Sequence, residues 1–252
     1  MEATEATQAV RWRVVDDGGS FRWGHAGDEL IAEWDGVLRL RATADGDLRA
    51  LEPLPGARAD VVDKTRCGAA AAFLRALRRR PSFHASAVAL GGDGLLCLGP
   101  SGAGKSTTAE RLCRRAGTRL LADDVTGMDL LAEGWVLLPS EAAVWLALDG
   151  GETKTRVTEC DVASSPAVVR CIASLAFATA PGVLVVRELR GADAASTLLQ
   201  SMFRFDETPA LRAHELDVVG SLVAQARVVQ ATRSTDIPAD AFVDALLEHV
   251  AK

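Results

Sequence analysis

Several residue types are scarce in this chain, and each scarcity excludes a kind of chemistry or of protein. The 252 residues include no tyrosine, so no catalytic step can rest on a phenol. The five cysteines are odd in number and lack the spacing of metal ligands, so we expect reduced thiols in a cytoplasmic protein. The longest stretch without a charge, 171–186, is interrupted by Pro181-Gly182 and is too short to cross a membrane. Lysine occurs only as Lys64, Lys105, Lys154 and Lys252.

Net charge and composition further limit which partners and which kind of protein are expected. The net charge is −6 and the isoelectric point is about 5.3, so we expect no nucleic-acid partner and no anionic membrane partner. The N-terminal residues are acidic and lack an apolar core, so no signal peptide is expected. A chain of this length with 48% hydrophobic residues can bury a large core. Whether copies associate as a homo-oligomer stays open.

The most specific motif is "GPSGAGKST", which follows the apolar run "LLCL". It fits the pattern G-x-x-x-x-G-K-[ST], in which glycines let backbone amides surround a phosphate, the lysine adds a cation, and the hydroxyl can bind Mg²⁺. The segment that follows has helical spacing, ends at Gly117, and points its positive N-terminus at the anion. The residues predicted to bind a nucleotide are Gly99, Ser101, Gly102, Ala103, Gly104, Lys105, Ser106 and Thr107.

Two apolar strands, "FHASAVAL" and "LLCLG", surround "GGDG", which indicates a hairpin leading into the loop. Most phosphate-loop enzymes instead begin with a parallel strand–loop–helix unit. If Leu90 pairs with Leu95, His84 lies opposite Ser101 and faces the phosphates. A histidine at a strand start is usually structural, so both roles stay open for His84.

A pair of carboxylates closes the next strand, "TRLLADD". Asp123 and Asp124 lie at its carboxyl end, where α/β sheets place their ligands. Side chains alternate on a strand, so one can face the acceptor and the other the Mg²⁺–phosphate side. The alternative is a simple turn, because aspartate is common where a strand ends.

The N-terminal part reads differently from the rest. Residues 1–60 contain short alternating segments separated by Gly-Asp turns, which indicates a β-rich segment packed on the core or forming a lid. A linker then leads to a helix expected at about 66–80. Further helices are expected at about 193–203, 213–226 and 238–250, with a strand at "RVVQATR". We therefore assign residues 61–252 to one catalytic domain.

The stretch from Phe83 to Val125 resembles the catalytic core of HPr kinase/phosphorylase and its smaller relatives. Three features agree in order: a histidine that opens the hairpin, the GKS loop, and the Ala-Asp-Asp strand end. The resemblance implies an α/β fold with a mixed sheet around a P-loop, of the type shared with phosphoenolpyruvate carboxykinases. It further implies ATP and Mg²⁺ at Lys105 and Ser106, Asp123 as the base, and His84 beside it.

The sequence also departs from that family. HPr kinases carry a Glu-Ile-Arg-Gly stretch with a metal-binding glutamate after the two aspartates, but "ELRG" at Glu188–Gly191 lies too far downstream. Glu141 is the better-placed candidate, which gives Ser106, Asp124 and Glu141 as predicted Mg²⁺ ligands. The Gly-rich loop "LDGGETKTRV" holds Lys154 and Arg156, which either cover the acceptor as a flap or belong to an ordinary solvated loop.

Short HPr-kinase-like proteins phosphorylate serine hydroxyls, some on precursors of ribosomal natural products such as lasso peptides and others on free serine. The resemblance therefore implies an ATP-dependent serine kinase, with a peptide acceptor as the first hypothesis and a small hydroxyl-bearing metabolite as the second. A nucleotide-binding regulatory module without transfer is the third.

Overall fold

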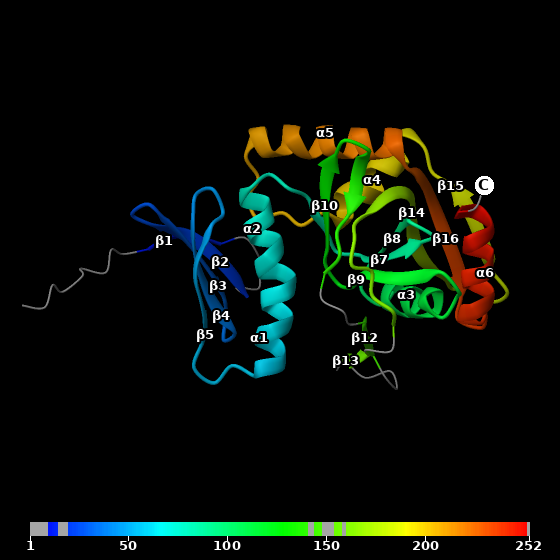
Figure 1. The fold of residues 1–252 in the computed structure, drawn as a ribbon, viewed down its shortest axis with the longest axis horizontal. Coiled ribbons are helices and arrows are strands. Elements are labelled where there is room, and N and C mark those ends of the chain that lie inside the picture. The colour runs from blue at the N-terminus through cyan, green and yellow to red at the C-terminus, as the bar shows by residue number, and fades with distance from the viewer. Residues whose placement is uncertain (1–9, 15–19, 141–143, 148–153, 158–159, 251–252) are drawn as a thin grey trace, which may run out of the picture. The chain divides into compact units, whose positions relative to one another are not determined.

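A computed structural model describes residues 10–14, 20–140, 144–147, 154–157 and 160–250. The fold is mixed α/β and contains a mixed sheet and a separate antiparallel sheet (Figure 1). The chain divides into two compact units, one formed by the residues up to Arg79 together with Arg204–Glu207, and the other by Arg80–Phe203 and Thr208–Lys252. Within the described residues, no helix is both long and apolar enough to cross a bilayer.

The N-terminal unit is an antiparallel meander with its strands in sequence order. Its strands are β1 (Arg11–Val14), β2 (Phe21–Ala26), β3 (Glu29–Trp34), β4 (Leu38–Thr43) and β5 (Leu48–Pro53). Buried and exposed residues alternate along β4, as the sequence pattern predicts for a sheet with one covered face. Leu38 and Leu40 lie on the covered face.

Helical residues cover that face, and this corrects the expected domain boundary. They form α1 (Ala59–Thr65), the π-helical turn η1 (Arg66–Ala70) and α2 (Ala71–Leu77). The ring of Phe73 is buried 5.8 Å from Phe21 and 6.3 Å from Trp34, between ring centroids. These helices belong to the N-terminal unit, so the division falls after Arg79 instead of after residue 60. The helical stretch also begins at Ala59, earlier than the predicted residue 66.

The larger unit is built on a nine-stranded sheet. Its strands and those of a separate hairpin are β6 (Ser82–Phe83), β7 (Ser86–Leu90), β8 (Asp93–Leu98), β9 (Thr118–Ala122), β10 (Thr126–Leu131), β11 (Gly134–Leu137), β12 (Val144–Ala147), β13 (Lys154–Val157), β14 (Ala167–Ala178), β15 (Leu184–Glu188) and β16 (Arg227–Ser234). The main path runs β6-β10-β11-β14-β8-β7-β9, and β16 pairs with β14 and β15. The hairpin is β12–β13.

Helices lie on both faces of this sheet (Figure 1). They are α3 (Lys105–Cys113), α4 (Gly191–Ser201), α5 (Pro209–Gln225) and α6 (Ala239–Val250). Strand β8 supplies both cores, because Leu95 and Cys97 join the cluster under α3 and α6, whereas Leu96 and Leu98 join the one under α4 and α5. β8 is therefore buried on both faces.

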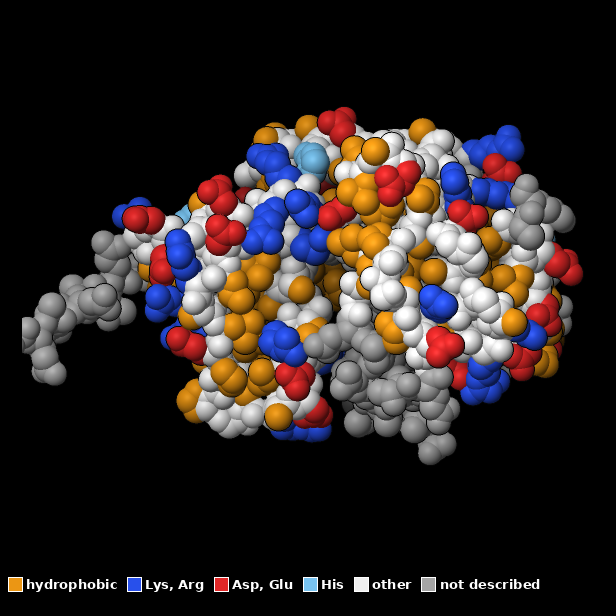
Figure 2. Space-filling view, in the orientation of Figure 1, with side chains coloured by type: hydrophobic (Ala, Val, Ile, Leu, Met, Phe, Trp, Pro, Cys, Tyr) orange, Lys and Arg blue, Asp and Glu red, His pale blue; other side chains and the backbone are white. Residues whose placement is uncertain are grey.

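The surface of this unit carries charges of both signs. On the face shown in Figure 2, acidic and basic side chains are interspersed. Ion pairs join α3 and the residues just after it to α6, since Arg111 pairs with Asp240 at 3.6 Å and Arg115 with Asp244 at 2.7 Å. Such pairs between exposed side chains contribute little to stability.

Candidate functional site

Strand direction places the ends of β8 and β9 together. β7 is antiparallel to both of these neighbours, so β8 and β9 are parallel to each other and their carboxyl ends lie at one edge of the sheet. Cys97 of β8 pairs with Ser86, and Ala122 of β9 pairs with the adjacent Ala87. The glycine-rich loop follows β8 and the two aspartates follow β9, so they lie on either side of the start of β7.

The glycine-rich loop joins β8 to α3, as the sequence predicts for a strand, loop and helix. Gly99, Gly102 and Gly104 have φ values of 141°, 80° and 87°, which side-chain-bearing residues rarely adopt. Gly99 is also confined in space, because a Cβ there would lie 2.6 Å from the carbonyl oxygen of Leu175 on β14. The glycines thus allow both the turns of the loop and its close approach to the sheet.

Lys105 begins α3, and its side chain folds back over the loop. Its ammonium donates hydrogen bonds to the carbonyl oxygens of Gly99, at 2.8 Å, and Pro100, at 3.1 Å. The residue is only 7% exposed. The cation is therefore held over the loop at the N-terminus of a helix, so both the lysine charge and the helix dipole attract an anion there.

Asp123 is a buried carboxylate with a fixed donor. It follows the last residue of β9, is 8% exposed, and accepts a hydrogen bond on Oδ1 from the hydroxyl of Ser86. Ser86 is fully buried at the start of β7. This bond restrains the orientation of the carboxylate next to the loop.

Asp124 faces a different group. Its φ of 70° is left-handed, a conformation that aspartate tolerates better than most residues, and it turns the chain after Asp123. Its Oδ1 lies 3.8 Å from Nδ1 of His84. The backbone amide of His84 donates to the Ser201 carbonyl at 2.7 Å, and the imidazole meets the Phe203 ring edge-on. The two aspartates thus have separate environments.

Cys97 shows that Lys105 and Asp123 act on the same small region. The pKa of this thiol is raised to about 12, chiefly by burial and to a smaller extent by Cys171 and the charge of Asp123, whereas the charge of Lys105 acts to lower it. Cys97 is therefore protonated near neutral pH and is not a nucleophile.

The hairpin register differs from the one assumed in the sequence analysis. Leu90 pairs with Asp93, not with Leu95, because the turn consists of Gly91 and Gly92 alone. Both glycines have positive φ, 59° and 106°, and two-residue hairpin turns favour such residues. His84 lies before β7 and does not pair with Ser101 in the ladder. Its place near the site comes from Asp124 instead.

The remaining predicted residues have less defined positions. Glu141 lies outside the described residues. Lys154 and Arg156 lie on strand β13, which pairs with β12, and not in the loop that the sequence suggested. Glu188 pairs with Val229 near the start of β16, away from the end of the sheet that carries the loop. Its pKa is lowered by a hydrogen bond from Arg190, so its carboxylate already has a cation partner.

Asp124 and Ser106 are residues at this edge of the sheet that could hold Mg²⁺. Mg²⁺ is usually bound by one or two carboxylates together with substrate phosphates, and Asp124 and the Ser106 hydroxyl provide donors of this kind. Among the described residues, no three His, Cys, Asp or Glu side chains are grouped as a metal site.

Sequence reasoning missed three residues beside the site. Ser86 was hidden in an apolar strand, although its position two residues after His84 could have drawn attention to it. Phe177 and Arg233 pair directly across the parallel strands β14 and β16. No local pattern reveals such a pair, because the two residues come from distant parts of the sequence.

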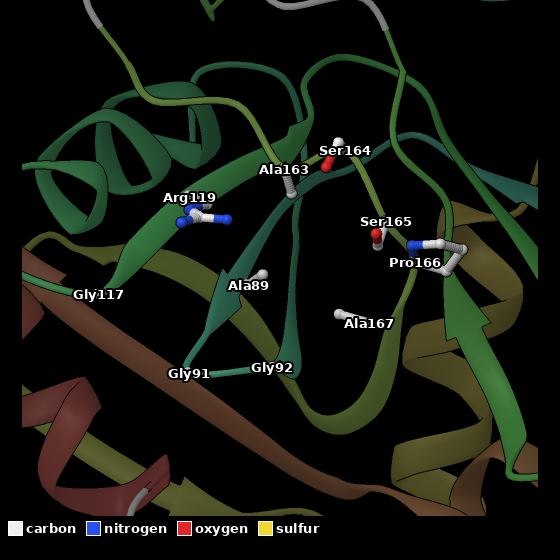
Figure 3. Close-up of a pocket in the computed structure, with 10 residues that line it drawn as sticks. All are labelled: Ala89, Gly91, Gly92, Gly117, Arg119, Ala163, Ser164, Ser165, Pro166 and Ala167. Carbon is white, nitrogen blue, oxygen red and sulfur yellow. The ribbon is translucent and has the colours of Figure 1, made fainter.

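A cavity of about 320 Å³ lies at the opposite end of β8 and β9, where these strands begin (Figure 3). It is lined by the Gly91-Gly92 turn, Gly117, Arg119 at the start of β9, and residues 163–167. Asp123 lies four residues beyond Arg119, roughly 13 Å along an extended strand. The cavity is therefore separate from the candidate site.

A comparison with known protein families finds no match, and neither does a comparison with curated proteins. Among solved structures, the chain is similar to the Hpr(Ser) kinase/phosphatase from Coxiella burnetii, with 14% sequence identity and a TM-score of 0.39. The similarity covers 67% of this chain and 94% of the other.

Proposed function

We propose that this protein is an ATP-dependent kinase that transfers the γ-phosphate to a serine-type hydroxyl, with a peptide as the acceptor. One observation carries the proposal: a buried lysine over a glycine-rich loop lies at the same sheet edge as a buried, hydrogen-bonded carboxylate. These are the two protein groups that phosphoryl transfer needs, a cation for the phosphates and a base for the attacking hydroxyl.

In this proposal the loop amides, the start of α3 and Lys105 hold the triphosphate. Mg²⁺, when bound, neutralises negative charge on the transferring phosphoryl group. Asp124 and Ser106 would hold the metal, and His84 lies beside Asp124, with Nδ1 at 3.8 Å from Oδ1. Lys105 remains close to the outer phosphates as the charge moves towards the leaving group.

Asp123 takes the proton of the acceptor hydroxyl. As the hydroxyl oxygen bonds to the γ-phosphorus, the bond from phosphorus to the bridging oxygen breaks, ADP leaves with that electron pair, and the proton passes to the Asp123 carboxylate. The hydroxyl of Ser86 keeps the carboxylate oriented by donating to Oδ1. A regulatory module without transfer has no use for such a base, and so we favour an enzyme.

The peptide acceptor is supported by the sequence resemblance to short HPr-kinase-like proteins. The test uses three acceptors in Mg²⁺-ATP: a short peptide ending in serine, the same peptide ending in alanine, and free serine. Mass spectrometry should detect a phosphoryl group on the first alone. Transfer to free serine alone would replace the peptide with a metabolite, and hydrolysis without transfer to either would contradict the kinase.

Two variants test the assigned roles. Asp123→Asn should slow transfer by roughly 10²–10⁴-fold with little change in ATP affinity, because only the base is lost. Lys105→Ala should abolish transfer and weaken ATP binding, because the phosphate charge is left uncompensated. Native transfer rates in either variant would overturn the mechanism.

A further inference from the structure

Phe177 and Arg233 stack against each other beside the glycine-rich loop. They are paired residues near the carboxyl ends of β14 and β16, two strands that run parallel to β8. The guanidinium carbon of Arg233 lies 5.0 Å from the centroid of the Phe177 ring. We define these two side chains as the Phe177–Arg233 shelf.

The shelf lies directly next to the loop. A Cβ on Gly104 would lie 3.8 Å from Nη2 of Arg233 and 3.9 Å from Cζ of Phe177. Gly104 precedes Lys105, so the shelf borders the end of the loop at which α3 begins. A ligand whose phosphates are held by the loop amides can therefore extend onto the shelf.

Contacts with the protein anchor Arg233, whereas Phe177 is partly exposed to solvent. Arg233 Nη1 donates to the Ile237 carbonyl at 2.8 Å, and its guanidinium also lies 5.4 Å from the ring of the buried Phe242. Phe177, in contrast, is 42% exposed, a large value for an aromatic residue near the end of a central strand. A partly exposed aromatic ring next to an anchored guanidinium is suited to stacking against another planar group.

In the strand order of the sheet, the residues assigned to proton transfer and the Phe177–Arg233 shelf lie on opposite sides of β8. β7 and β9, with Ser86 and Asp123, lie on one side of β8, whereas β14 and β16, with the shelf, lie on the other. A ligand with phosphates at one end and a planar ring at the other matches this order. Such a ligand can direct its terminal phosphate towards Asp123 and its ring towards Phe177.

We propose that the Phe177–Arg233 shelf binds the base of the nucleotide by stacking. This inference rests on the proposed function, because it requires a nucleotide in the loop. Stacking does not depend on the edge of the base, so the shelf supplies affinity and orientation for the nucleoside part of ATP. The base would be held away from the carboxylates, which leaves their side free for the acceptor.

The test compares two ligands that differ in the nucleoside. Calorimetric titrations with ATP and with inorganic triphosphate, both with Mg²⁺, are made on the native chain and on variants. Phe177→Ala should weaken ATP binding about tenfold, the size of effect expected when a stacked aromatic is lost, and leave triphosphate binding unchanged. Phe177→Trp should keep ATP affinity, because a ring remains.

Two controls accompany these variants. Val185→Ala removes an exposed apolar side chain from the neighbouring edge strand β15 and should change neither affinity. Lys105→Ala should weaken the binding of both ligands, because both carry the phosphates. Phe177 is partly exposed, so its replacement should leave the thermal unfolding midpoint close to the native one.

The outcomes separate this inference from the proposed function. Three results would each overturn the proposal that the base stacks on the shelf. They are a native ATP affinity in Phe177→Ala, equal losses of ATP and triphosphate affinity in that variant, and a loss of ATP affinity in Phe177→Trp. A native chain that binds neither ligand would overturn nucleotide binding and the shelf with it. A native chain that shows the expected binding pattern but transfers no phosphate would overturn the kinase and leave the shelf supported.

Discussion

Removing the hydroxyl of Ser86 is a direct test of the idea that Asp123 is an oriented base. The hydroxyl is fully buried and donates to a carboxylate that is itself 8% exposed. Hydrogen bonds to charged groups contribute about 1.5–3 kcal/mol. We therefore expect Ser86→Ala to lower the free energy of unfolding by about 2 kcal/mol.

The same interaction should be visible in the rate of transfer. If the carboxylate must keep its orientation as it accepts a proton, most of the lost interaction appears in the activation barrier. Since 1.36 kcal/mol corresponds to a factor of ten, a loss of about 2 kcal/mol lowers kcat by roughly 30-fold. The effect should be smaller than that of Asp123→Asn, because the base itself remains.

Thr126→Val provides a matched control. The Thr126 hydroxyl is also fully buried, but it donates to the carbonyl oxygen of Ala85 at 3.0 Å and not to a carboxylate. This variant should lose about 1 kcal/mol of stability and keep its kcat. Urea unfolding and steady-state kinetics measure the two quantities for both variants. If Ser86→Ala lost stability but kept the native kcat, as the control should, Asp123 would be a structural residue.

Three further predictions follow from buried or confined groups. Gly99→Ala should abolish ATP binding in calorimetry, because its Cβ would meet the Leu175 carbonyl at 2.6 Å; native affinity would show that the loop can move away. Glu33→Gln should lower the free energy of unfolding by roughly 2 kcal/mol at neutral pH. Burial acts to raise the pKa of Glu33, but the hydrogen bonds and charges of Arg39 and Arg22 outweigh burial and lower this pKa. The stability that Glu33 contributes should therefore vanish as the pH falls through the lowered pKa. Urea unfolding at several pH values measures this, and a loss in Glu33→Gln that does not depend on pH would contradict the ion pair. The pKa of Cys97 is raised, chiefly by burial, from 9.0 to about 12, so stability should fall as the pH rises from about 9 towards about 12. Cys97→Ala should reduce that fall over the same range, and an unchanged slope would contradict the burial argument.

Local patterns in the sequence predicted much of the region from Phe83 to Asp124. The glycines, the apolar runs and the aspartate pair each fix a turn, a strand or a strand end within a few residues, and β8, α3 and β9 are found where these patterns indicate. The hairpin register was wrong by two residues on β8, because a pair of adjacent glycines allows a tighter turn than the four-residue one assumed.

Features that depend on distant parts of the chain could not be predicted in this way. The helix at Ala59–Leu77 joins the N-terminal sheet because Phe73 packs on Phe21 and Trp34, and its own sequence does not show this. Phe177 and Arg233 meet only because β14 and β16 are parallel neighbours. Ser86 becomes a partner of Asp123 only through the pairing of β7 with β9. Side-chain periodicity predicts elements well and their partners poorly.

The position of β7 between β8 and β9 has a consequence for how the chain folds. All of the residues assigned to phosphate and proton transfer whose positions are described fall within the continuous stretch from His84 to Asp124. Short sequence separations make loop closure inexpensive in entropy, and a tight hairpin such as β7–β8 forms within about 1–10 µs. The shelf, in contrast, requires β14 and β16 to meet across a long intervening segment. We therefore expect the transfer half of the site to assemble early and locally, and the half that receives the nucleoside to form late, when the parallel strands close the sheet.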